Sequence, residues 1–84
     1  MHPKKHHLDS RLLMLIAYVE RGNPDEMLET PETAQEIGVS TGWLNHGRLN
    51  GYGPPATYLS VKKIRYRRSE ILDWLRGRQE RAEA

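Results

Sequence analysis

The chain has 84 residues, with 13 Lys/Arg, 11 Asp/Glu and no cysteine. A chain of this length is expected to form one small domain, and the lack of cysteine excludes disulfides and thiolate metal sites as supports for its core. The longest apolar run, residues 12–19, is shorter than the roughly 20 apolar residues that span a bilayer, and it lacks the layout of a signal peptide. We therefore expect a cytoplasmic protein without a membrane partner.

Charge is unevenly distributed along the chain. Residues 1–40 contain four Lys/Arg and seven Asp/Glu, whereas residues 41–84 contain nine Lys/Arg and four Asp/Glu. No acidic residue occurs between Glu36 and Glu70. Because a protein surface normally mixes both signs, a segment of one sign this long indicates a polyanionic partner.

An arm and a helix are expected first. Residues 1–7 have no periodicity and should form a flexible arm, whose three histidines lack the carboxylate or cysteine that would complete a metal site. A helix is expected over about residues 9–21, with Asp9 as its cap and Gly22 at a left-handed exit. Its apolar stripe must be buried, either in the core or against a neighbouring protomer, and consists of Leu12, Leu15, Ile16 and Val19.

Two short helices are expected over about residues 30–49. Thr30 can cap the first, with Pro31 in its first turn, and Gly38 can end it. Ser40 can then cap a second helix from about Thr41. Two helices joined through a glycine are typical of a helix-turn-helix, whose second helix can bind DNA.

The second of these helices carries a polar stripe. Thr41, Asn45 and Arg48 share one face, and Asn and Arg are side chains that pair with adenine and guanine in the major groove. Gly42 would allow a close approach to phosphate, and His46 is expected at the surface or beside a phosphate. The alternative is an ordinary exposed polar face.

A β-hairpin is expected over about residues 57–68. The turn at residues 60–63 contains no glycine, which leaves the register open. Ile64 and Tyr66 alternate with cations, which indicates a strand with one face on the core and the other presented to an acidic partner. The cations are Lys62, Lys63, Arg65, Arg67 and Arg68. They could instead protect the edge of a sheet.

A last helix is expected over about residues 69–78, capped by Ser69, and followed by a charged tail over residues 79–84. Trp74 lies in its apolar arc, and Trp74 and Trp43 are expected to be core anchors. The tail has no heptads, which excludes a long coiled coil. Residues 8–78 should therefore form a single domain.

Three stretches, TPETAQEIGVS, GYGPP and IRYRRSEILDWL, resemble the MerR-like winged helix-turn-helix of phage and plasmid excisionases and AlpA-type regulators. The resemblance covers about residues 28–76. It implies a mainly α fold with a β-hairpin wing, here with an additional N-terminal helix. The sequence departs from the family at Trp43 and Gly47, where a small residue and a tryptophan are usual, and at Val61, where relatives tend to have glycine.

The resemblance implies a sequence-preferring, double-stranded DNA-binding protein at the nucleoid. Its role would be that of an excisionase, or recombination directionality factor, which binds cooperatively and bends DNA. A transcriptional regulator of AlpA type is the first alternative, and a protein-interaction module that antagonises a DNA-binding partner is the second. A site-specific integrase and head-to-tail contact between protomers on DNA are further candidate interactions. No motif for catalysis, metal or cofactor binding is found, so we do not expect an enzyme.

The recognition helix is expected to contact DNA through Ser40, Thr41, Gly42, Asn45, His46 and Arg48. The wing is expected to contact phosphates through Lys62, Lys63, Arg65, Arg67 and Arg68.

Overall fold

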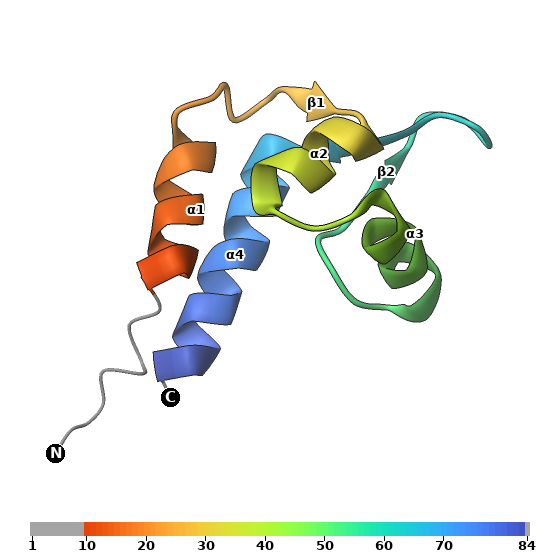
Figure 1. Cartoon of the computed structure of the whole chain (residues 1–84). Helices are drawn as coiled ribbons and strands as arrows, with labels where there is room; N and C mark the ends of the chain where they lie inside the picture. The colour runs from red at the N-terminus through yellow and green to blue at the C-terminus, as the bar shows by residue number, and fades with distance from the viewer. Residues whose placement is uncertain (1–9, 84) are drawn as a thin grey trace, which may run out of the picture.

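The computed structural model describes residues 10–83 and is mainly helical (Figure 1). The expected arm over residues 1–7 and the cap at Asp9 lie outside the described residues. Within them, the chain forms four helices and three short strands: α1 (Ser10–Glu20), β1 (Met27–Leu28), α2 (Thr30–Ile37), α3 (Thr41–Asn50), β2 (Thr57–Tyr58), β3 (Ile64–Arg67) and α4 (Arg68–Glu83). No helix among these is both long and apolar enough to cross a lipid bilayer.

The strands form one antiparallel sheet in the order β1-β3-β2. The predicted hairpin is present, with Thr57 opposite Arg65 and Tyr58 opposite Ile64. β1 was not predicted, because two residues are too few to show an alternating pattern. It pairs with the other edge of β3, so that β3 is the central strand.

Tyr66 anchors the sheet to the helices and is fully buried. Ile64, two residues away on the same face of β3, packs against the core, as the alternation predicted. The core also includes residues from all four helices and β1: Ile16, Val19, Leu28, Ala34, Ile37, Leu44, Ile71, Leu72 and Leu75. The predicted burial of one face of the hairpin is therefore confirmed.

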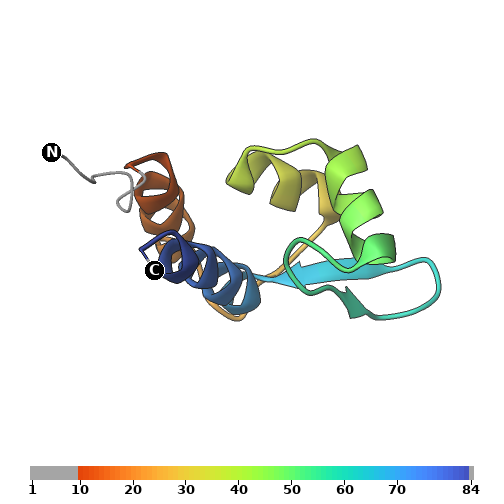
Figure 2. The same cartoon turned by 90° about the horizontal axis from the view of Figure 1, so that it is seen from below.

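The two terminal helices lie side by side, away from α3 and the β2–β3 hairpin (Figures 1 and 2). Ile16 and Val19 of α1 are only 7% and 0% exposed, and Leu12 and Leu15 pack against the same core. The apolar stripe of α1 is therefore part of the core, and the alternative expectation of a protomer interface there is wrong for Ile16 and Val19. Because these two side chains are buried, they could contact a second protomer only if their own protomer unfolded.

Several helix ends differ from prediction. The residue that caps α2 is Glu29 and not Thr30, and its backbone N–H donates to Glu32 Oε1 (3.0 Å). α4 begins at Arg68, directly after β3, so Ser69 is already helical and its backbone N–H donates to the Pro24 carbonyl (2.9 Å). α4 also continues to Glu83, through most of the expected tail.

Candidate nucleic-acid interface

α3 begins at Thr41, as its sequence predicted, and ends at Asn50, one residue later than expected. The Ser40 hydroxyl accepts a hydrogen bond from the backbone N–H of Trp43 (3.0 Å), which satisfies one of the donors left open at a helix start. Gly51 ends the helix in the left-handed conformation (φ 83°). The residues facing the interior are Leu44 and Gly47, whereas Thr41, Gly42, Asn45 and His46 are exposed. This leaves the predicted polar face of α3 at the surface.

Arg48 links this polar face to the sheet. Its Nη1 donates to the hydroxyl of buried Tyr66 (3.0 Å), and its Nη2 donates to Asn45 Oδ1 (2.9 Å). Because an arginine carries five N–H donors, these two bonds orient the guanidinium and leave donors for a ligand. Asn45 and Arg48 are therefore held together, as their spacing predicted, and both are fixed relative to β3.

Gly47 has a structural role that the sequence did not reveal. Its carbonyl accepts the backbone N–H groups of Gly51 (2.8 Å) and Tyr52 (2.9 Å), and the loop after α3 packs directly over it. A Cβ at position 47 would lie 2.5 Å from the carbonyl oxygen of Tyr52. Glycine at this position therefore allows the loop to cover the helix.

The tip of the β2–β3 hairpin is an ordered turn that needs no glycine. The backbone groups of Ser60 and Lys63 bond to each other (3.2 and 3.4 Å), and Ser60 Oγ accepts from the N–H of Lys62 (3.3 Å). None of the described non-glycine residues has a positive φ, so the turn carries no such strain. Lys62 and Lys63 are exposed at this tip, so the predicted phosphate contacts of these two residues are sterically possible.

Two of the remaining hairpin cations face acids of the same chain. Arg65 Nη2 lies 3.5 Å from Glu29 Oε2, and Arg67 Nη1 lies 3.9 Å from Asp25 Oδ1. Both carboxylates are largely exposed, so each pair contributes at most about 1 kcal/mol and can open. The acid-free stretch of sequence around these cations therefore does not leave them without counterions in the fold, although Arg65 and Arg67 remain near the surface.

Arg68 is not an exposed wing residue, and this corrects the prediction that it contacts phosphate. Its side chain is buried, where Nη1 donates to Glu36 Oε1 (2.6 Å) and Nη2 donates to Glu26 Oε1 (2.8 Å). Nη1 also lies within 3.4 Å of the Val19 carbonyl oxygen. One guanidinium thus joins the start of α4 to α1, α2 and the segment before β1.

The surroundings of Arg68 keep it charged. Burial alone lowers the pKa of the guanidinium, but the hydrogen bonds and charges of Glu36 and Glu26 outweigh this and raise the pKa above its ordinary value. Gly22 leaves space for the group, because a Cβ there would lie 2.3 Å from Arg68 Cζ. Gly22 does not have a positive φ, so the predicted left-handed exit from α1 is wrong and close packing explains the glycine instead.

The structure therefore divides the predicted contacts into two groups. Seven of the predicted residues are exposed, and they lie on α3, at its N-terminal cap or at the hairpin tip: Ser40, Thr41, Gly42, Asn45, His46, Lys62 and Lys63. Arg48, Arg65 and Arg67 are partly buried and paired within the chain, and Arg68 is buried. Within residues 10–83, no three His, Asp or Glu side chains gather in a way that could hold a metal ion.

Sequence reasoning missed the hydroxyl of Tyr66 as the anchor of Arg48. It also missed Tyr58, which lies on the edge strand β2, is largely exposed, and lines a shallow hollow together with Gly47 and Arg48. The β-branched and aromatic residues of β2 were visible in the sequence, but the hollow shared with α3 depends on the loop of residues 51–56, which no periodic pattern describes. No protein-family model matches the chain, and no curated protein matches it.

Proposed function

We propose that the chain is a winged helix-turn-helix protein that binds double-stranded DNA with a preference for sequence. In this proposal α3 enters the major groove, and the β2–β3 hairpin contacts the flanking phosphates. A ten-residue helix is about 15 Å long, which is sufficient to cross a groove about 12 Å wide. The protein acts as a binding protein and not as an enzyme.

The observation that carries the proposal is the bond between Arg48 and Tyr66. It joins the polar face of α3 to the central strand of the hairpin sheet, so the two elements form one unit. The acid-free segment between Glu36 and Glu70 contains α3, the following loop, β2 and β3. The Asn, Arg and Lys side chains of this segment favour a polyanion with readable base edges, although Asp25 and Glu29 from outside the segment lie beside Arg67 and Arg65.

If α3 reads base edges, Asn45→Ala should lose affinity for the preferred sequence in particular. We expect this variant to weaken binding to the preferred duplex by about 1–3 kcal/mol and to reduce the preference over other sequences. Asn45 is exposed, so the fold should be unchanged. Fluorescence anisotropy with a duplex selected from a random pool, and with a scrambled duplex, measures both effects. An equal loss on both duplexes would mean that α3 does not read bases.

Lys62→Ala is the matched control at the hairpin tip. A lysine bound to phosphate carries no base identity, so this variant should weaken binding to both duplexes about equally. Arg48→Ala is less informative, because it also leaves the buried Tyr66 hydroxyl without its partner. Tyr66→Phe provides the comparison for that variant, since it removes the hydroxyl and keeps Arg48.

The salt dependence of binding should reflect the cations that remain available. Arg48, Lys62 and Lys63 predict a slope of log K against log salt of about −3. The slope should approach about −4 to −5 only if DNA also displaces Asp25 and Glu29 from Arg67 and Arg65. Titrations at several salt concentrations measure this slope. Affinity that hardly changes with salt would contradict an electrostatic DNA surface.

Asp25→Asn tests whether the Asp25 carboxylate competes with DNA phosphate for Arg67. Asp25 is highly exposed and lies near Arg67. Removing its charge should strengthen DNA binding modestly, because phosphate no longer competes with a carboxylate. Unchanged or weaker binding would indicate that Arg67 does not contact DNA.

Within this class, we propose the role of an excisionase, supported by the motifs GYGPP and IRYRRSEILDWL. A transcriptional regulator would use the same DNA surface. Footprinting on the DNA that surrounds the gene separates the two roles. Tandem sites within a recombination sequence are expected for the excisionase, whereas a single site at a promoter would favour the regulator.

A further inference from the structure

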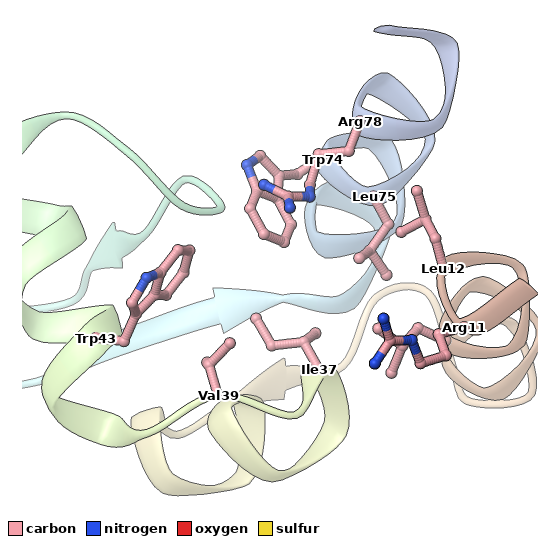
Figure 3. Close-up of a pocket in the computed structure, with 9 residues that line it drawn as sticks. Arg11, Leu12, Ile37, Val39, Trp43, Trp74, Leu75 and Arg78 are labelled. Atoms are coloured by element: carbon pink, nitrogen blue, oxygen red, sulfur yellow. The ribbon is translucent and has the colours of Figure 1, made fainter. Parts of the chain in front are cut away.

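An apolar groove lies between the terminal helices and the α2–α3 pair (Figure 3). Side chains converge on it from all four helices and the α2–α3 turn. Its volume is about 180 Å³, comparable with the roughly 150 Å³ cavity that accepts a benzene ring in another protein. We call it the tryptophan groove, and its lining residues are Arg11, Leu12, Leu15, Ile37, Val39, Trp43, Trp74, Leu75 and Arg78.

Both tryptophans of the chain lie in this groove and are only partly buried. Their ring centroids are 6.1 Å apart at an interplanar angle of 57°. They were predicted to be core anchors, and they do pack against the core, but each also offers apolar surface to the groove. Partly exposed tryptophan is a common anchor of protein interfaces.

The charge of the groove has one sign. Arg78 lies over the Trp74 ring, with Cζ 4.9 Å from the ring centroid, and Arg11 lies on the α1 side. None of the lining residues is acidic. An arginine stacked on an aromatic ring is already oriented and can still offer its planar edge to a carboxylate. The groove is therefore complementary to a ligand that is both apolar and acidic.

The apolar surface continues beyond the groove across α1. A neighbouring hollow shares Arg11, Leu15 and Ile37 with it and reaches Met14 and Tyr18, which are largely exposed. A contact of this length suits a segment of polypeptide better than a small molecule. A stacked nucleotide base fits poorly, because Arg78 covers Trp74 and the Trp43 ring lies 5.0 Å from that of Tyr52.

We infer that the tryptophan groove binds an acidic segment of a partner protein. The segment inserts one bulky apolar side chain above Leu75 and Ile37 and places a carboxylate against Arg78. This function would be additional to DNA binding. On a helix with 3.6 residues per turn, Trp43 points about 140–160° away from Asn45 and Arg48, so a bound segment leaves the polar face of α3 accessible.

The two tryptophans provide the readout, because their fluorescence should change when the groove is filled. The probe is a synthetic peptide of glutamate, aspartate, leucine and phenylalanine without tryptophan. We expect a saturable change in fluorescence with this peptide. Two control peptides, one with the apolar residues replaced by serine and one with the acids replaced by glutamine, should bind at least about tenfold more weakly.

Two variants that each replace one cation by an acid test where the peptide binds. Arg78→Glu should weaken the peptide about tenfold or more, because an attraction becomes a repulsion, whereas Lys62→Glu at the hairpin tip should not. For DNA the order should be reversed, with Lys62→Glu the weaker binder. Failure of the peptide to bind would thus be distinct from failure of the DNA proposal. Arg78 is exposed, and circular dichroism checks that its variant folds.

Three results would overturn the inference. The first is equal binding of the serine control, which would show attraction by charge alone. The second is unchanged peptide binding by Arg78→Glu. The third is a dimer of the wild-type chain in sedimentation, formed without peptide and accompanied by the same fluorescence change, which would assign the groove to a second copy.

Discussion

Arg68→Met should lower the free energy of unfolding by about 3 kcal/mol, because it leaves the carboxylate of Glu36, whose side chain is only 16% exposed, without its cation. Glu26 is about half exposed, so water can solvate its carboxylate after the change. A chain of 84 residues has a total stability of about 4–13 kcal/mol, so this is a large part of it. Methionine retains an unbranched apolar stem, which limits the loss of packing. Urea denaturation followed by circular dichroism measures the effect.

Arg67→Met is the matched control one residue earlier. The Arg67 side chain is 42% exposed, and its partner Asp25 is 3.9 Å away, so its loss should cost less than about 1 kcal/mol. Equal losses for the two variants would contradict the structural role of Arg68. A triple variant, Arg68→Met with Glu26→Gln and Glu36→Gln, should recover much of the stability, because no charge then remains without a partner.

The burial of Arg68 could have been predicted from the same alternation that placed Tyr66 inside. Arg68 follows Ile64 and Tyr66 at intervals of two, so it falls on the inward face of the strand that was expected to run to residue 68. Its apparent place in a run of exposed cations concealed this. The acids that receive it, Glu26 and Glu36, lie 42 and 32 residues away in the sequence, and no local pattern connects them.

Local signals predicted α3 and the hairpin well. Ser40 and Gly51 set the ends of α3 through backbone chemistry that acts within a few residues. The register of the hairpin and the strand β1 depend on pairing across the sheet, which a single sequence does not encode locally. For the candidate site, the exposed face of α3 was predictable, whereas the bond of Arg48 to Tyr66 required the fold.

The two glycines inside α3 should respond to alanine in opposite directions. Gly42→Ala should stabilise the protein by about 0.5–1 kcal/mol, because alanine has the higher helix propensity. The position is exposed, and the nearest atom to a Cβ there, Ser40 Oγ, is 3.8 Å away. Gly47→Ala gains the same propensity but must displace the backbone of Tyr52, which lies 2.5 Å from the new Cβ.

Overpacking of this kind typically costs about 1–3 kcal/mol, and the buried Pro54 in the same loop limits how far Tyr52 can move. We therefore expect Gly47→Ala to be destabilised by about 1–2 kcal/mol, so that the two variants differ by roughly 1.5–3 kcal/mol. Paired thermal and urea melts measure this difference. If Gly47→Ala were as stable as Gly42→Ala, the loop after α3 would not pack on the helix as described. The hollow formed by Gly47, Arg48 and Tyr58 beside the proposed DNA surface would then have a different shape.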